Sequence, residues 1–327
     1  SSVAHANIAS INLDAVRAAP GVVDVISAAD IPGRNDCGPI VHDDPILADG
    51  LVQFVGQPIF AVVADSYVAA RKAARLAEIE YQALPAVLDI ASGVQQQSWV
   101  LPPMQLRRGD AARALGASPR RLQGDISVGG QEQFYLEGQI SYVAPREDGC
   151  FHLWCSTQHP TEMQQVVAHA LGIDFNQVVV EMRRMGGGFG GKESQSAIFA
   201  CIAAIAAHKL RRPIKLRLDR DDDMSITGKR HGFEFNYDVG YDDTGLIHAA
   251  SVEMAAQAGF SADLTGPVLT RAVCHFDNAY YLGDVAIDAY SIKTNTQSNT
   301  AFRGFGGPLG ACAIEFIIDN VARDLGD

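Results

Sequence analysis

The sequence predicts an α+β protein of two domains, in which helices pack against mixed, mainly antiparallel sheets. Its 327 residues correspond to about two domains of roughly 150 residues each. Segments in which apolar and polar residues alternate predict half-buried strands. Other segments carry apolar residues at helical spacing and predict amphipathic helices. The two kinds of segment follow one another along the chain, and no internal repeat is visible.

The composition is that of a globular, acidic chain. Hydrophobic residues make up 47% of the sequence and charged residues 20%, which excludes bulk disorder. The formal net charge of −12 is poorly suited to coating a nucleic-acid backbone or an anionic membrane. No apolar run reaches the length of a membrane span. We therefore expect neither nucleic acid nor a membrane among its partners.

The cysteines form no metal-binding pattern. None belongs to a C-x-x-C pair, so the sequence predicts no iron–sulfur or zinc site built by this chain alone. We expect free, mostly buried thiols and a cytoplasmic location. The six cysteines are Cys37, Cys150, Cys155, Cys201, Cys274 and Cys312.

Residues 1–92 are expected to form a small α/β unit. A run of β-branched residues at Val22–Ile26 predicts a buried strand. The Ala-rich segment Tyr67–Ala77 predicts a helix, which Asp65 or Ser66 can cap.

Residues 93–126 differ in character from what precedes them. Proline, glycine and glutamine punctuate the stretch, and five arginines face only two aspartates, so it is locally basic. We predict a connector that carries one short helix, Asp110–Leu115.

Residues 127–327 are expected to form a second domain with long β segments. Apolar residues recur at helical spacing between Pro160 and Gly172, which predicts an amphipathic helix. The further elements expected are an apolar helix at Ser196–Leu210, alternating strands at Ile214–Leu218 and Phe233–Val239, and a hairpin turn at Asp242–Gly245.

The sharpest local feature is the stretch Gly186-Gly187-Gly188-Phe189-Gly190-Gly191-Lys192-Glu193. Its glycines cost conformational entropy, so we expect the bare backbone to approach a ligand or a neighbouring segment. The stretch nearly matches the phosphate-binding loop G-x-x-x-x-G-K-[ST], but Glu193 stands where a hydroxyl would bind magnesium. Three interpretations stay open: a nucleotide loop, a tight turn for close packing, and backbone donors facing another polar or anionic group beside Glu193.

Three other segments carry candidate chemistry. Asn299–Pro308 places two aromatic residues and an arginine among glycines, which favours either a filled turn or a pocket for a planar ring. Gln158 lies where a predicted strand leads into a helix and can serve as a ligand contact or as a cap. The acidic run Asp219–Asp223 lacks the spacing of a calcium loop, so we expect it to be solvated or to cap a helix.

Taken together, five segments form a recognisable series: Gly130–Glu137, Ser156–Gln158, Arg184–Glu193, Arg271-Ala272 and Ala301–Pro308. In order and spacing they resemble the molybdenum-binding subunit of the molybdenum hydroxylase family. The resemblance runs from about residue 20 to the end of the chain. It implies an α/β-hammerhead domain over residues 1–92, followed by the first part of a molybdopterin-binding domain over residues 127–327.

The resemblance also implies a substrate class. Glu193 matches a substrate-binding glutamate, Arg271 an arginine that stabilises negative charge developing on a purine, and Phe305 an aromatic residue that packs on the ring. Purine-oxidising members have the glutamate and the arginine together, whereas aldehyde-oxidising relatives usually lack them. The implied reaction is hydroxylation of hypoxanthine and xanthine at a carbon next to a ring nitrogen, with water as oxygen source. The alternatives are an aldehyde-oxidising molybdenum hydroxylase and a non-catalytic module that binds an anion or nucleotide.

The implied cofactor is molybdenum held by molybdopterin, with no protein side chain as a metal ligand. Gln158 matches a glutamine that hydrogen-bonds a ligand on molybdenum, and Phe189 and Gly190 match a loop whose backbone approaches the cofactor. Matches to the loop near the metal are Ala301, Phe302 and Arg303. The family implies 2Fe–2S clusters and FAD in a partner subunit and an oligomeric enzyme, with NAD or oxygen as the final acceptor.

The family chain continues well beyond the residues that match Gly307-Pro308. That continuation carries the catalytic base, a glutamate, and further pterin-binding loops. We therefore expect residues 1–327 to be a portion of a longer subunit that alone neither retains the cofactor tightly nor turns over purines.

Overall fold

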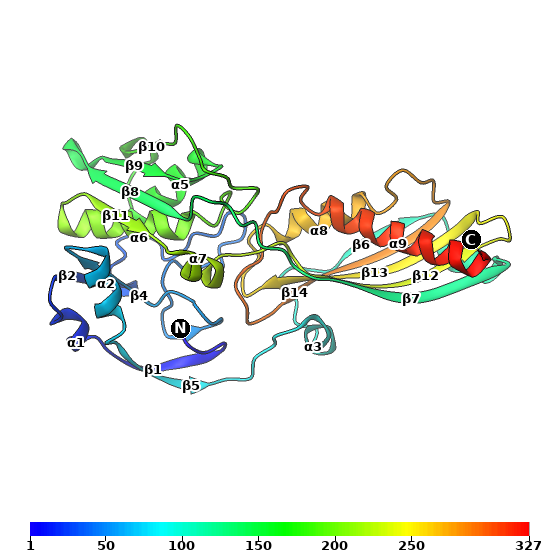
Figure 1. Ribbon diagram of the computed structural model, residues 1–327, viewed down its shortest axis with the longest axis horizontal. Coiled ribbons are helices and arrows are strands. Elements are labelled where there is room, and N and C mark those ends of the chain that lie inside the picture. The colour runs from blue at the N-terminus through cyan, green and yellow to red at the C-terminus, as the bar shows by residue number, and fades with distance from the viewer. Residues whose placement is uncertain (327) are drawn as a thin grey trace. The chain divides into compact units, whose positions relative to one another are not determined.

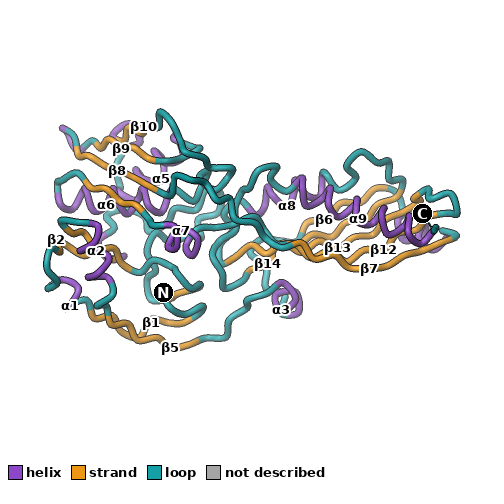
Figure 2. The backbone as a smooth tube through the Cα atoms, viewed as in Figure 1, coloured by secondary structure: helices purple, strands orange, loops and turns teal. Residues whose placement is uncertain are grey.

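The computed structural model describes residues 1–326 and divides them into two compact units (Figures 1 and 2). The first unit contains residues 1–86, 133–228 and 295–298, and the second contains residues 87–132, 229–294 and 299 onward. Each unit has one parallel pair of strands, and its other strand pairs are antiparallel. The prediction of an α+β fold with mixed, mainly antiparallel sheets is confirmed.

The N-terminal part of the first unit is the small α/β layer that the sequence predicts. Its elements are β1 (Ala6–Asn12), α1 (Asp14–Arg17), β2 (Val22–Ser27), a 3-10 turn (Ala28–Asp30), β3 (Leu51–Val52), β4 (Phe60–Ala64), α2 (Tyr67–Ala74) and β5 (Glu78–Ala83). The strands form a sheet of order β3-β1-β5 and a pair β2-β4. Ser66 caps α2 by accepting a hydrogen bond from the backbone of Ala69. The helix ends three residues before the predicted end, because Arg75 is already its C-cap.

The rest of the first unit is a four-stranded sheet with its helices. The elements are β8 (Ile140–Pro145), a 3-10 turn (Glu147–Gly149), β9 (Phe151–Cys155), α5 (Pro160–Leu171), a 3-10 turn (Phe175–Gln177), β10 (Val178–Glu181), α6 (Ala197–Leu210), β11 (Ile214–Arg217) and α7 (Arg220–Ile226). The strand order is β10-β9-β8-β11, and β9 and β10 are parallel. As predicted, Pro160 opens α5 and Gly172 ends it in the left-handed conformation at φ 65°.

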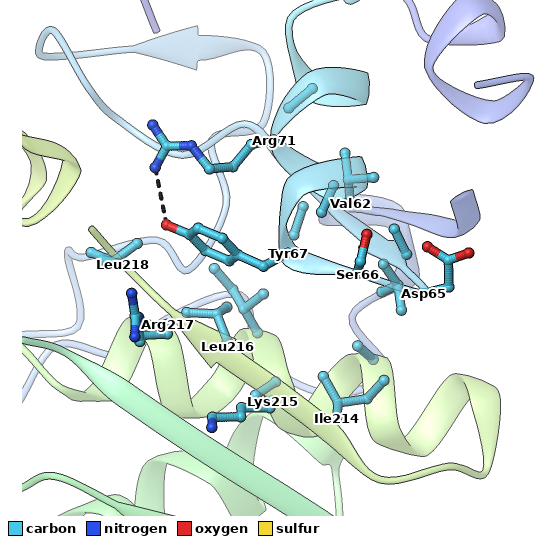
Figure 3. Close-up of a pocket in the computed structure, with 18 of the residues that line it drawn as sticks. Val62, Asp65, Ser66, Tyr67, Arg71, Ile214, Lys215, Leu216, Arg217 and Leu218 are labelled. Atoms are coloured by element: carbon cyan, nitrogen blue, oxygen red, sulfur yellow. Dashed lines mark hydrogen bonds between the residues drawn. The ribbon is translucent and has the colours of Figure 1, made fainter. Parts of the chain in front are cut away.

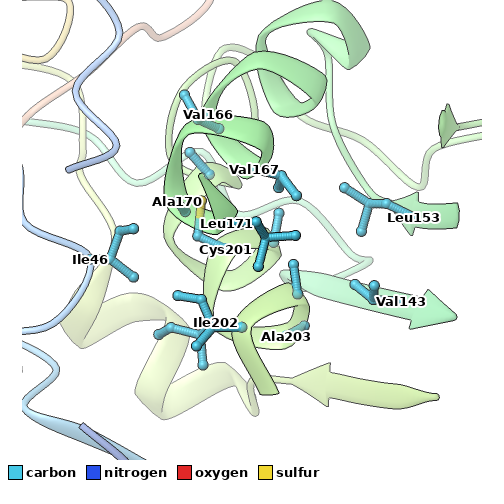
Figure 4. Close-up of a cluster of buried hydrophobic side chains, with 14 of the residues drawn as sticks. Ile46, Val143, Leu153, Val166, Val167, Ala170, Leu171, Cys201, Ile202 and Ala203 are labelled. Atoms are coloured by element: carbon cyan, nitrogen blue, oxygen red, sulfur yellow. The ribbon is translucent and has the colours of Figure 1, made fainter. Parts of the chain in front are cut away.

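The core of the first unit forms around α6. This helix is apolar on every side, and its residues from Phe199 to Ala207 are buried. Figure 4 shows side chains of α5 and α6 packed together with Val143 and Leu153 of the sheet, and with Ile46 of the N-terminal part. Because α6 has no polar face, its stability depends on burial in this core. The glycine-rich loop leads directly into α6, so its C-terminal end is attached to a rigid element.

The second unit is one five-stranded sheet with helices. Its elements are α3 (Ile90–Gln95), β6 (Met104–Arg108), α4 (Ala111–Ala117), β7 (Arg120–Val128), β12 (Phe233–Tyr241), β13 (Ile247–Gly259), α8 (Thr265–Cys274), β14 (Asp284–Lys293) and α9 (Gly307–Leu325). The strand order is β6-β14-β13-β12-β7. The parallel strands β13 and β14 are joined through α8. The predicted alternation in β12 is confirmed, since Phe233, Phe235, Tyr237 and Val239 are all buried.

Helices α8 and α9 pack against the sheet of the second unit (Figure 1). Apolar residues of both helices, among them Leu269, Ala272 and Ile317, share one buried cluster with Phe235 and Ile287 of the strands. No helix among residues 1–326 combines the length and the apolar character needed to span a membrane.

The expectation for residues 93–126 needs a correction. The predicted helix is present as α4, but the segment also contains β6 and β7, which are the two edge strands of the five-stranded sheet. Two arginines of this basic stretch form ion pairs with residues of the neighbouring strands. Arg107 pairs with Asp288, and Arg121 pairs with Asp238. Edge strands commonly carry such charged residues, so the basic composition of this stretch does not distinguish an edge strand from a connector. The domain boundaries at residues 92 and 126 remain a prediction.

All six cysteines are free thiols, as predicted. Only half of them are buried, however: Cys37, Cys155 and Cys201. Cys274 and Cys312 are exposed on α8 and α9.

Candidate active site

In the first unit, the glycine-rich loop is held by Gln158. This residue lies between β9 and α5, where the sequence places it. Its side-chain oxygen Oε1 accepts a hydrogen bond from the backbone of Gly190 at 2.8 Å and a longer one from Lys192 at 3.4 Å. Its own backbone N–H donates to the carbonyl of Lys192 at 2.7 Å. Gln158 is therefore connected to the loop through both its side chain and its backbone.

The glycines of the loop meet two separate requirements. Gly187 and Gly190 have φ values of 98° and 102°, a region that other residues rarely adopt. Gly188 is needed for a close approach, because a Cβ there would lie 2.9 Å from Cδ of Gln158. Phe189 also lies in the left-handed region, at φ 56°, and its side chain is 47% exposed.

Three successive N–H groups of this loop are left without an acceptor. The N–H groups on either side of them are satisfied: Gly186 donates to the carboxylate of Glu137, and Gly190 to Gln158. Within residues 1–326, the N–H groups of Gly187, Gly188 and Phe189 donate no hydrogen bond. The tip of the loop therefore presents a row of backbone donors.

Lys192 is a structural residue. Its side chain is fully buried, and its ammonium group donates to the carbonyl of Glu137 at 2.5 Å and to the hydroxyl of Ser156 at 2.7 Å. The same ammonium lies 4.5 Å from the centre of the Tyr135 ring. Burial lowers the pKa of Lys192. A phosphate-binding lysine has to reach the ligand, so this geometry argues against the nucleotide-loop interpretation.

Glu193 follows the loop and lies beside Gln158. Its Oε1 accepts from Nε2 of Gln158 at 3.5 Å, which is long for a hydrogen bond. Glu193 as a whole residue is half-buried. The first unit thus brings together four of the predicted site residues: Gln158, Phe189, Gly190 and Glu193.

A buried polar network under the loop was not predicted. The hydroxyl of Tyr135 donates to Asp223 at 2.6 Å, and both residues are 1% exposed. Burial raises the pKa of Tyr135. Gln139 links this pair to the loop, since its Nε2 donates to Tyr135 at 3.0 Å and to the carbonyl of Gly191 at 3.0 Å. Asp223 belongs to the acidic run, which otherwise forms α7 with Asp219 as its cap, as predicted.

The remaining predicted site residues lie in the second unit. Arg271 is exposed in the last turn of α8. The loop before α9 makes a turn in which Phe305 N–H donates to the carbonyl of Phe302 at 2.6 Å. Gly306 then packs on α8, because a Cβ at this position would lie 2.7 Å from the nitrogen of Ala272. The neighbours of Arg271 and Phe305 are therefore in contact.

The 301–305 loop, which contains Ala301, Phe302, Arg303 and Phe305, is anchored at its start. Ala301 is 1% exposed. The preceding residue, Thr300, donates from its hydroxyl to buried Asp263 at 2.6 Å and from its N–H to the carbonyl of Lys229 at 2.9 Å. Arg303 is exposed and Phe305 half-buried, so these two side chains remain accessible in part.

A buried histidine in the second unit makes stability depend on pH. His231 is completely buried, its Nε2 lies 2.8 Å from the hydroxyl of Thr265, and burial lowers its pKa to about 3. Below about pH 6.5 the unfolded chain binds a proton that the folded chain does not. The free energy of unfolding should therefore fall, by up to ~1.4 kcal/mol per pH unit, as the pH drops from about 6.5 toward 3.

Urea unfolding at a series of pH values measures this slope in the chain and in two variants. His231→Gln should reduce the slope, whereas His275→Gln, at an exposed position, should leave it unchanged. Equal slopes in the chain and in His231→Gln would show that His231 is not the group that titrates.

No group of three or more His, Cys, Asp or Glu side chains within residues 1–326 is arranged to hold a metal ion. A cavity of about 630 Å³ in the first unit lies between β4, α2 and β11. Figure 3 shows its lining, with Tyr67 and Arg71 on one side and Ile214 and Leu216 on the other. None of the predicted site residues lines it. The predicted site residues of the first unit therefore lie on and beside the glycine-rich loop, outside this cavity.

Comparison with known proteins gives the family. Residues 94–327 match the family model described as "Molybdopterin cofactor-binding domain". Residues 1–85 match the model described as "Aldehyde oxidase and xanthine dehydrogenase, a/b hammerhead domain". These matches confirm the resemblance inferred from the five motifs and both predicted fold types.

Individual relatives agree with these matches. The chain is 43% identical over 323 residues to xanthine dehydrogenase of Dictyostelium discoideum, and 41% identical over 327 residues to xanthine dehydrogenase/oxidase of Gallus gallus. The alignments cover 99% and 100% of this chain but only 24% of each relative. Among solved structures, the aldehyde oxidoreductase of Desulfovibrio gigas matches with a TM-score of 0.92 at 25% identity, over 100% of this chain and 38% of that one. The chain belongs to the molybdopterin cofactor-binding domain family.

Proposed function

We propose that the chain supplies part of the substrate and cofactor site of a molybdenum hydroxylase that oxidises purines, with hypoxanthine and xanthine as substrates. The observation that carries this proposal is the glycine-rich loop, in which three free N–H groups lie next to Gln158 and Glu193. Free N–H groups suit an anionic cofactor, and a carboxylate beside them suits the polar edge of a purine. The xanthine dehydrogenases named above support the same substrate class.

The donor set fits a molybdenum cofactor. The backbone N–H groups of Gly187, Gly188 and Phe189 donate no hydrogen bond within residues 1–326 and can donate to an anionic group that needs no side-chain metal ligand. The proposal assigns Ala301, Phe302 and Arg303 to the same cofactor. We assign Gln158, Phe189 and Gly190 to the same contact surface. When bound, the cofactor supplies the transferred oxygen, which originates from water, and takes up the electrons of the substrate.

Three side chains act on the substrate in this proposal. Glu193 binds the purine edge by hydrogen bonds. Arg271 provides a fixed positive charge where negative charge develops on the ring during oxidation. Phe305 provides a flat apolar face for stacking. The proposal thus assigns one residue of the first unit and two residues of the second unit to the substrate.

The proposal extends to the rest of the enzyme. The electrons have to leave the site, and we assign that step to 2Fe–2S clusters and FAD in a partner subunit of an oligomeric enzyme. The six free thiols support a cytoplasmic location.

A second candidate is oxidation of aldehydes by the same kind of enzyme. The hammerhead match is shared by aldehyde oxidases and xanthine dehydrogenases, and the Desulfovibrio gigas protein is an aldehyde oxidoreductase. Binding of a nucleotide is the weakest candidate, because the lysine of the loop is buried on its own hydrogen bonds.

Steady-state kinetics of the complete enzyme separate the two leading candidates. We expect kcat/KM for xanthine to exceed that for an aromatic aldehyde by at least about tenfold, since a site built to hydrogen-bond a substrate rejects one that lacks the matching groups. Turnover of the aldehyde without any turnover of hypoxanthine or xanthine would contradict the proposal.

A further inference from the structure

Arg230 is a buried arginine whose guanidinium group makes most of its contacts with the 301–305 loop. The residue is 5% exposed. Its Nη1 donates to the carbonyl of Phe305 at 3.1 Å, and its Nη2 donates to the carbonyl of Arg303 at 2.8 Å. Its Nε donates to Oε1 of Gln131 at 2.8 Å. Two carbonyls of the loop are thus bridged by one planar group.

The flat face of the same guanidinium also stacks on an aromatic residue of the loop. Its Cζ lies 4.1 Å from the centre of the Phe302 ring, which is stacking distance. None of the ion pairs within residues 1–326 includes Arg230. Burial accordingly lowers its pKa. A buried charge without a carboxylate partner is costly, so a role in geometry explains its presence better than a role in stability.

The loop needs such a support because of its backbone conformation. Gly304 and Phe305 both lie in the left-handed region, at φ 88° and 61°. Glycine tolerates this conformation, but a bulky aromatic residue does so only when its surroundings hold it there. The two carbonyls that Arg230 binds lie on either side of Gly304. The guanidinium therefore contacts the loop where two successive residues adopt the left-handed conformation.

We propose that Arg230 is a positioning residue for the substrate and cofactor site. By bridging the carbonyls of Arg303 and Phe305 and stacking on Phe302, it fixes the direction in which Phe305 and Arg303 are presented. The positioning role rests on the proposed function only for the identity of the ligand that Phe305 and Arg303 contact. The support of the loop by Arg230 follows from the contacts alone.

The first test concerns the loop and does not depend on turnover. In the complete enzyme, we compare hydrogen–deuterium exchange of peptides spanning residues 299–310 in Arg230→Met, Arg230→Lys and Arg323→Met. Arg323 is an exposed arginine of α9, paired with Asp319, and serves as the matched control. Exchange in the loop should accelerate about tenfold or more in Arg230→Met, while peptides from β14 and the control variant stay unchanged. An unchanged loop in Arg230→Met, or in Arg230→Lys if the methionine variant does not fold, overturns the proposal.

The second test asks whether Arg230 acts through Phe305. With xanthine as substrate and molybdenum content measured in parallel, kcat/KM should fall roughly 10- to 100-fold in Arg230→Met, and Arg230→Lys should recover part of the loss. In a Phe305→Ala background the same substitution should have little further effect, because the side chain that it positions is gone. Fully additive losses would overturn the positioning role. If the parent enzyme does not oxidise xanthine, the proposed function fails, and the exchange experiment still decides the role of Arg230 in the loop.

Discussion

Replacing Arg271 with methionine is expected to lower kcat for xanthine about 100- to 1,000-fold in the complete enzyme. In the proposed reaction the purine ring becomes negatively charged, and a positive charge held in place stabilises that state more than the neutral substrate. Arg271 lies in the last turn of α8, a helix packed against the sheet. Its backbone therefore needs little reorganisation during the reaction. The loss should appear mainly in kcat, because the interaction strengthens as charge develops.

Two comparisons make this result specific. Arg323→Met removes an arginine from the exposed surface of α9 and should leave xanthine turnover unchanged. An aromatic aldehyde, in which the charge develops on the carbonyl oxygen and not on a purine ring, should lose much less activity in Arg271→Met than xanthine does. Equal losses for both substrates would point to damage of the fold, and an unchanged kcat for xanthine would remove Arg271 from the proposed site.

The second large effect is expected from Gly306→Ala. A single methyl group here would overlap the carbonyl oxygen of Val268 and lie 2.7 Å from the nitrogen of Ala272, both of them backbone atoms of α8. Backbone atoms in a packed helix cannot move aside cheaply, so the free energy of unfolding should fall by about 2–3 kcal/mol. The backbone of Gly306 itself, at φ −86°, is acceptable for alanine. The cost is therefore one of contact and not of conformation.

The next residue provides the matched control. Outside its own helical turn, a Cβ on Gly307 would come no closer than 3.9 Å to any atom, the nearest belonging to the side chain of His275. Gly307→Ala should change stability by less than about 0.5 kcal/mol. Chemical denaturation of the chain and of both variants measures the difference. Similar stabilities for Gly306→Ala and Gly307→Ala would mean that α8 and α9 do not pack as closely as described.

Local sequence patterns predict those helices and strands in which buried residues recur at a regular spacing. Helix α5 was predicted with both ends because Pro160 and Gly172 mark them, and β12 because every second residue is apolar. The edge strands β6 and β7 were missed because their charged residues face solvent and pair across the sheet. Short-range patterns do not report such long-range pairings.

The candidate site residues also fall into a group that the sequence predicts and a group that it does not. The loop residues that present a ligand surface were found through their unusual glycine content and through the family motifs. The residues that support these loops were not found: Tyr135 and Asp223 under the first loop, and Arg230 under the second. Their partners lie about 70 to 90 residues away along the chain. A buried tyrosine, aspartate or arginine carries no local signal of such a contact.

The interleaving of the chain has a consequence for how this region acquires its structure. Neither compact unit is a single uninterrupted stretch of sequence, since the backbone passes from one to the other at residues 86–87, 132–133, 228–229, 294–295 and 298–299. Each core forms only when segments that are far apart in the sequence come into contact. The conformational entropy of the chain that is lost when the loop between them closes slows folding. A gene fragment that ended at any one of these five positions would separate chain segments that form the same core. We therefore expect the two units to fold cooperatively during synthesis and not one after the other.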